Sequence, residues 1–386
     1  MEVDSGRLRR RRPLFLHRPL VVAIAAFSIG CVLACFPPRA RTAERTRTVT
    51  DMAGRRVQVP AQVERIACLP GPSYELVFML GGKDQIAVVR EDHKQYPLAV
   101  LTNPDLRDYS SSITQVGPRT RINVEEFLQA ELDAVIYYTL PSAVEMLEEA
   151  GIPVFCTWAT ESPHSLKELM RQEKRLVTSL AVMLGRGAPD EARRWCRYLE
   201  QTVRFIRSRT KGLERAERPR VYIGNSWGRN PLATWGGDGH EYTVRLCGGR
   251  YVASGIRAAK FPEVSLEQVM AWAPDVIVID SHGGSPDKVV DSIRGNPDWA
   301  SIPAVRRGEV HRMPSGVFHL NKGSSKPLYF LWLAKLLHPE LFDDIDMVSV
   351  ICEYFASFYD APIPREIARH ALKGWGHGEL EASSGK

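Results

Sequence analysis

The sequence lacks several signatures that would indicate a catalytic or metal-binding protein. It contains no HExxH motif, no P-loop and no dinucleotide-binding fingerprint. Five cysteines follow residue 36, and none of them forms a CxxC pair, which leaves a zinc ribbon or a thioredoxin motif unsupported. Their wide spacing and odd number leave disulfide pairing undetermined, and we expect most of them to be buried as small apolar residues. They are Cys68, Cys156, Cys196, Cys247 and Cys352.

The chain also lacks the basic surface of a nucleic-acid-binding protein. Its 386 residues carry 51 Lys and Arg against 45 Asp and Glu, but six of the Arg and only two of the acids lie in residues 1–34. Without that segment the chain has 45 basic and 43 acidic side chains, so we expect no nucleic-acid partner. A hydrophobic content of 44% is typical of a folded protein, and the length predicts two or three domains.

The N-terminal apolar run is too short for a membrane-spanning helix. The uncharged stretch from Leu20 to Phe36 follows Arg18, whereas a spanning helix needs about 20 apolar residues and a signal-peptide core about 7–15. It ends in Val-Leu-Ala-Cys35, which resembles the lipobox of bacterial lipoproteins. We therefore expect residues 1–36 to be a signal peptide with lipid on Cys35, and the rest of the chain to be exported to the periplasm or the outer face of the cytoplasmic membrane. An uncleaved anchor and ordinary signal cleavage are the alternatives.

The remainder alternates short apolar runs with helical stretches, which predicts α/β lobes with parallel sheets. Between residues 165 and 212 the strand signal disappears, and a long helical stretch is broken only near Gly185–Pro189. We predict a linker at 37–48, an N-terminal α/β lobe at 49–162 and a helical connector at 163–217. A C-terminal α/β lobe with closing helices follows at 218–375, and then a flexible tail at 376–386.

A short pattern occurs once in each predicted lobe. Residues 123–126 precede Asp133, and residues 265–268 precede Asp275, with each Asp opening an apolar strand. Asn123 and Ser265 are predicted N-caps, and the side chains three residues later are placed to close capping boxes.

The second helical position of each copy is a glutamate, Glu125 in the first and Glu267 in the second. These two carboxylates are predicted to point toward solvent at corresponding sites of a pseudo-symmetric body. Offsetting the helix dipole, which contributes about 0.3–1 kcal/mol, is the simpler role for them.

Taken in order, these segments resemble the class III substrate-binding proteins of bacterial ABC importers, which handle iron–siderophores, haem, cobalamin and related metal complexes. The resemblance covers about residues 48–375. It includes the entry segment from Thr50 to Arg55, Val116-Gly117 before Asn123, and the second copy of the pattern from Val264 to Asp275. It also includes Trp299 with the residues 302–305 and the closing segment 331–346.

The resemblance implies two Rossmann-like lobes joined by one long helix, with the ligand held in the cleft between them. It also implies that the glutamate of each lobe docks against Arg pockets on the membrane permease, which here would be Glu125 and Glu267. We expect a monomer without an intrinsic cofactor, not an enzyme, whose small-molecule ligand is a metal chelate. A ferric siderophore is the favoured ligand, with haem, cobalamin or molybdate as alternatives.

Ligands of open α/β sheets bind beyond the carboxyl ends of the strands. The loops at those positions supply aromatic side chains for flat contact, cations for an anionic chelate, and histidines that can coordinate a metal. The candidate ligand-binding residues are Arg90, His93, Trp158, Trp227, Trp235, His240 and His319.

An enzyme remains the competing interpretation. Residues 224–228 fit the GxSxG pattern of a serine hydrolase and follow a predicted strand. A nucleophile elbow runs directly into a helix, however, and Pro231 with Gly236 and Gly237 do not favour one. A metal chelatase of related bilobal architecture is a further alternative.

Overall fold

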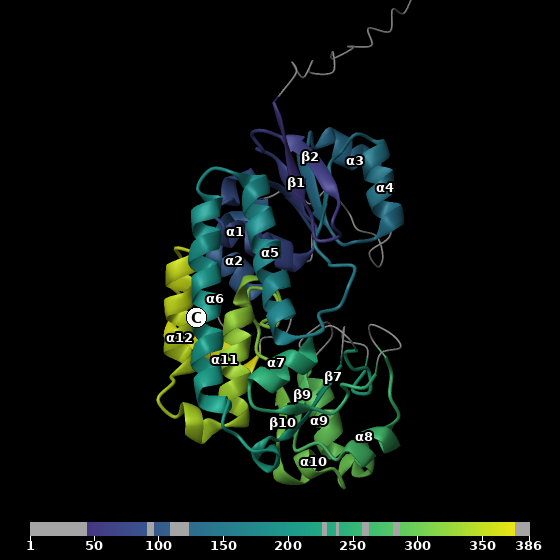
Figure 1. Ribbon diagram of the computed structural model, residues 1–386, viewed down its shortest axis with the longest axis vertical. Coiled ribbons are helices and arrows are strands. Elements are labelled where there is room, and N and C mark those ends of the chain that lie inside the picture. The colour runs from purple at the N-terminus through teal and green to yellow at the C-terminus, as the bar shows by residue number, and fades with distance from the viewer. Residues whose placement is uncertain are drawn as a thin grey trace, which may run out of the picture. The chain divides into compact units, whose positions relative to one another are not determined.

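The computed structural model describes residues 45–90, 96–108, 123–225, 230–236, 239–256, 262–280 and 286–374. They form mixed α/β structure containing two parallel sheets of four strands each (Figure 1). Within these ranges, each helix is too short or too polar to cross a bilayer.

An antiparallel hairpin precedes the first sheet. Its strands β1 (Thr46–Thr50) and β2 (Arg56–Pro60) are joined by a turn in which Gly54 has a φ of 83°. Asp51 is fully buried in this turn and accepts hydrogen bonds from the backbone and the guanidinium of Arg55. Asp51 also accepts a bond from the backbone N–H of Cys156, so this carboxylate ties the hairpin to the first sheet.

The first sheet has the strand order β4-β3-β5-β6, and every neighbouring pair is parallel. Its apolar strands have buried side chains on both faces, which is typical of parallel sheets covered by helices. The elements of this part are β3 (Ile66–Cys68), α1 (Gly71–Met79), β4 (Ile86–Val89), α2 (Pro97–Thr102), α3 (Val124–Gln129), β5 (Ala134–Tyr137), α4 (Pro141–Glu149) and β6 (Val154–Cys156).

The stretch that the sequence predicted to be a helical connector contains two helices, α5 (Leu166–Leu184) and α6 (Ala188–Thr210). The predicted break is confirmed. Gly185 caps the C-terminus of α5 with a φ of 69°, which suits only glycine without strain, and Pro189 lies in the first turn of α6. α5 and α6 pack against each other, and α6 also packs against α11 (Figure 1).

The second sheet has the order β10-β9-β7-β8 and is also parallel throughout. Read from the other end, it repeats the topology of the first sheet, with β7 in the place of β3 and β9 in the place of β5. The elements are β7 (Arg220–Gly224), α7 (His240–Leu246), β8 (Arg250–Tyr251), α8 (Leu266–Trp272), β9 (Val276–Ile279), α9 (Pro286–Gly295), α10 (Pro303–Arg307) and β10 (Val310–Arg312). The closing helices are α11 (Lys326–Leu337), α12 (Met347–Phe358) and α13 (Arg365–Lys373).

The internal repeat is confirmed in the hydrogen bonds that open corresponding strands. The backbone N–H of Asp133 donates to the carbonyl of Arg65 at 2.8 Å, and that of Asp275 donates to the carbonyl of Arg220 at the same distance. Each Asp side chain in turn accepts from the backbone N–H of the same Arg, at 3.0 and 2.9 Å.

A buried carboxylate joins α1 to the segment that precedes α11. Glu75 is fully buried, and its Oε1 accepts hydrogen bonds from the hydroxyls of Ser324 and Ser325 and from the backbone N–H of Ser325, at 2.7, 2.6 and 2.9 Å. Burial raises the pKa of Glu75 to about 7, although these hydrogen bonds act in the opposite direction. The hydroxyl of Tyr359 also contacts Ser324, and that of Tyr354 donates to its carbonyl.

Candidate functional site

The carboxyl end of the second sheet carries a buried cluster of polar and aromatic side chains. Trp235 is only 2% exposed, and its indole N–H donates to Asp280 Oδ2 at 3.0 Å. Asp280 directly follows β9 and is fully buried. Lys322 Nζ lies 4.4 Å from the Trp235 ring centroid, which is a cation–π distance. The imidazole of His240, the first residue of α7, lies 5.2 Å from the same ring.

A second group of side chains comes from the segment between β10 and α11. The ring of His319 meets that of Tyr96 edge-on at 5.8 Å, and Tyr96 also contacts Phe318 at 4.6 Å. The backbone N–H of Lys322 donates to the carbonyl of His319, so one turn of chain connects this group to the Trp235 cluster. In this segment, His319 therefore contacts Tyr96, and Lys322 contacts the ring of Trp235.

Asn321 lies between these two contacts and is 2% exposed. Neither its Oδ1 nor its Nδ2 has a hydrogen-bond partner within the described part of the chain. Leaving a buried amide unsatisfied costs about 1–3 kcal/mol, so such groups are rare unless they meet a ligand or a water. Asn321 is thus a candidate ligand contact that offers both a donor and an acceptor.

The structure places the predicted site residues unevenly. Trp235 and His240 lie together, and His319 precedes by three residues Lys322, whose ammonium group lies over the Trp235 ring. Arg90 follows β4 at the carboxyl edge of the first sheet, where it is half-buried. Trp158 follows β6 at the same edge, and its ring packs against Tyr138 at 4.5 Å. His93, Trp227 and Cys35 lie outside the described residues, as does Ser226 of the GxSxG pattern.

Sequence reasoning did not single out Asp280 or Asn321. Asp280 follows an apolar strand directly, which is a recognisable signal for a residue at the carboxyl edge of a sheet. Asn321 carries no such signal, because nothing in the local sequence shows that its amide is buried.

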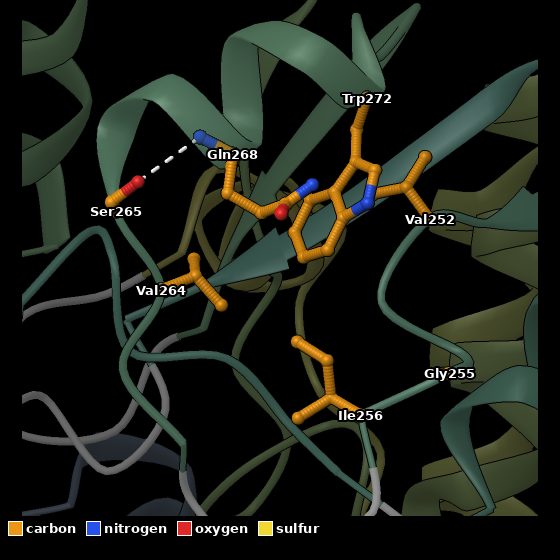
Figure 2. A pocket seen from close by; sticks show the side chains of 7 residues that line it. All are labelled: Val252, Gly255, Ile256, Val264, Ser265, Gln268 and Trp272. Atoms are coloured by element: carbon orange, nitrogen blue, oxygen red, sulfur yellow. Dashed lines mark hydrogen bonds between the residues drawn. The ribbon is translucent and has the colours of Figure 1, made fainter.

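The two predicted helix N-caps are confirmed, but the capping boxes are wrong. Asn123 Oδ1 accepts from the backbone N–H of Glu125 at 3.2 Å, and Ser265 Oγ accepts from that of Gln268 at 3.2 Å. The reciprocal bonds are absent from both helices as the structure describes them. The Gln268 side chain extends toward the indole of Trp272 instead (Figure 2), and both side chains line a cavity.

This cavity, of about 460 Å³, lies beside α8 (Figure 2). None of its described lining residues carries a charge, so it does not suit an anionic ligand. They are Val252, Gly255, Ile256, Val264, Ser265, Gln268 and Trp272.

Glu125 and Glu267 are both exposed, as the repeat predicted. Hydrogen bonds from its own backbone N–H and from Ser265 lower the pKa of Glu267. Neither carboxylate forms an ion pair within the described ranges. Both are therefore available to a partner.

The cysteines behave as the sequence suggested. All five described cysteines are free thiols, and Cys68, Cys156 and Cys247 are buried. Burial raises the pKa of Cys156 to about 11. Among the described residues, no group of three or more His, Cys, Asp or Glu side chains is arranged to hold a metal ion.

A model of the family described as periplasmic binding protein matches residues 66–317, about two thirds of the chain. This chain belongs to the periplasmic binding protein family. It is of the class III type that serves ABC importers, and the two matching parallel sheets are the fold of that type.

Individual relatives differ in what they bind. The molybdate-binding protein MolA of Haemophilus influenzae is 23% identical over 352 residues, which cover 86% of this chain and 95% of MolA. The vitamin B12-binding protein of Yersinia pestis is 25% identical over 264 residues, which cover 64% of this chain and 84% of that protein. In structure, molybdate-bound MolA matches with a TM-score of 0.71 at 23% identity over 82% of this chain and 99% of MolA. Helicobacter pylori CeuE in its Ni–His complex matches with a TM-score of 0.66 at 19% identity over 86% and 100%.

Proposed function

We propose that this protein is the extracytoplasmic binding component of an ABC importer and that its cargo is a small anionic metal species. The observation that carries the proposal is the cluster of Trp235, Lys322 and His240 together with the unsatisfied, buried amide of Asn321, which precedes Lys322 in the chain. The cation attracts negative charge, the aromatic ring supplies apolar contact, and the amide supplies a donor and an acceptor for oxygen or nitrogen atoms of the ligand.

Two cargoes share this chemistry, an oxyanion such as molybdate and an anionic chelate such as a ferric siderophore. Binding of molybdate by MolA, whose likeness extends over most of both chains, supports the oxyanion. The siderophore remains the proposal drawn from the sequence. Arg90 and Trp158, at the carboxyl edge of the first sheet, would contact the part of the ligand that faces that lobe.

Thermal unfolding of the purified protein with each ligand in turn tests this proposal. A ligand at a hundredfold excess over its dissociation constant stabilises the folded state by about 2.7 kcal/mol. We expect such stabilisation from molybdate or a ferric siderophore, and not from neutral sugars. If molybdate, ferric siderophores, haem, cobalamin and nickel–histidine all leave the melting temperature unchanged, the proposed cargo class is wrong.

We further propose that Glu125 and Glu267 dock against cationic pockets of the permease. Their exposure, their lack of ion pairs among the described residues and their identical places in the two copies of the repeat support this role. Two fixed charge-assisted contacts would set the orientation of the protein on its partner.

We also propose that the chain functions as a monomer that a lipid on Cys35 holds at the membrane surface. Intact-mass spectrometry of the protein extracted from its own membranes tests the anchor, because a lipidated chain begins at Cys35 and carries the added mass of the acyl groups.

A further inference from the structure

Each docking glutamate is accompanied by an exposed apolar side chain at the same position of the repeat. Five large hydrophobic side chains are exposed in the described part of the chain: Leu101, Leu128, Met146, Val182 and Met270. Leu128 follows Glu125 by three residues, and Met270 follows Glu267 by three residues. Their exposed fractions are 51% and 41%.

Helices α3 and α8 present corresponding faces to their sheets, as their buried residues show. Phe127 in α3 and Val269 in α8, which precede the exposed apolar residues, are both fully buried against the neighbouring sheets. Side chains three residues apart lie on the same side of a helix, so Leu128 lies beside Glu125 and Met270 lies beside Glu267. Packing within each lobe therefore uses the inward face of the helix and gives no reason for an apolar residue on the outward face.

We propose that Glu125 with Leu128, and Glu267 with Met270, form two matched docking pairs, each of which receives an Arg or Lys of the importer's permease flanked by an apolar side chain. This inference rests on the proposed function and adds the apolar half of each contact. An apolar neighbour excludes water from the ion pair, which strengthens the attraction between its charges, and energetically important contacts are commonly shielded in this way.

The test is uptake by cells of origin that carry variants of the full chain in place of their own copy. Cells receive molybdate, a ferric siderophore, haem, cobalamin and nickel–histidine, and mass spectrometry measures their content of Mo, Fe, Co and Ni. The double variant Leu128→Gln/Met270→Gln removes apolar surface from both pairs. We expect it to accumulate the transported element about tenfold more slowly, which corresponds to about 1.4 kcal/mol lost over the two contacts together.

The matched control is Leu101→Gln/Met146→Gln, because these side chains are 38% and 42% exposed but lie outside the repeat. We expect this control to accumulate the element at the wild-type rate, and both double variants to keep wild-type affinity for that compound. Equal slowing by the test and control variants, or wild-type uptake by the test variant, overturns the inference.

Deletion of the whole chain distinguishes a failure of the docking pairs from a failure of the proposed function. If deletion of the whole chain changes the cellular content of none of the four elements, the chain does not supply an importer with these cargoes, and both proposals fall together. If deletion abolishes uptake while Leu128→Gln/Met270→Gln does not reduce it, only the docking pairs are refuted.

Discussion

Replacing Glu75 by Gln should remove a pH dependence from the stability of the protein. The carboxyl group is fully buried, and its pKa rises from 4.5 to about 7 in the folded chain. Below pH 4.5 the group is protonated in the folded and unfolded chains alike, so its contribution to stability is complete. As the pH rises from 4.5 toward 7, the unfolded chain releases the proton before the folded chain does, and the contribution of this group to the free energy of unfolding is lost.

The size of the loss follows from the difference between the two pKa values. A rise from 4.5 to about 7 corresponds to about 3 kcal/mol of the free energy of unfolding. Burial raises the pKa values of the neighbouring Tyr354 and Tyr359 well above their ordinary value, so these groups stay neutral over the same range.

The assay is urea unfolding of the wild type and of Glu75→Gln at several values between pH 4.5 and pH 8. The difference between the two proteins isolates this group, because the other carboxylates titrate in both. We expect the wild type to lose about 3 kcal/mol relative to the variant across this range. Glu149→Gln, which replaces an exposed carboxylate, is the control and should follow the wild type. A difference between wild type and Glu75→Gln that stays constant with pH refutes the reasoning.

Three further predictions concern the ligand, the repeat and the motion of the lobes. Asn321→Leu should raise the free energy of unfolding by about 1 kcal/mol and weaken ligand binding about tenfold. Urea denaturation measures the first effect, and calorimetric titration with the ligand measures the second. Burial acts to raise the pKa of Asp275, but hydrogen bonds from Arg220 and Arg307 hold it well below its usual range. Asp275→Asn should therefore lower the free energy of unfolding by about 1–2 kcal/mol at pH 7. Urea titrations should show this difference shrinking below about pH 4, where the wild-type carboxylate becomes protonated on unfolding. Ligand binding should change the radius of gyration only slightly in X-ray scattering, because the α5–α6 connector is helical, and a large compaction would contradict this.

The fold was predictable where one stretch of sequence determines one element. The apolar runs became parallel strands because they are short and bounded by turn residues. Asp133 and Asp275 revealed the repeat because each opens an apolar strand at the same distance after its glutamate. In the structure, each bonds to an Arg that precedes or opens a neighbouring strand. The helix break was predictable because Gly185 and Pro189 act on the backbone directly.

The polar interior was not predictable in the same way. Glu75 lies in an apolar helix, and its hydroxyl partners are 249 and 250 residues away in the sequence. The burial of Asn321 likewise depends on elements that meet only in the folded chain. Gln268 matched a capping box by spacing, but its side chain extends along a cavity whose walls include residues after β8.

The most direct test of the whole account is the double variant Glu125→Gln/Glu267→Gln, assayed for both cargo affinity and cellular uptake. The account predicts that the purified variant binds its metal species as tightly as the wild type, while cells that depend on it no longer accumulate the element. Uptake at the wild-type rate, or a loss of affinity in the purified variant, would contradict the claim that the protein holds its ligand away from these residues and presents them to a permease.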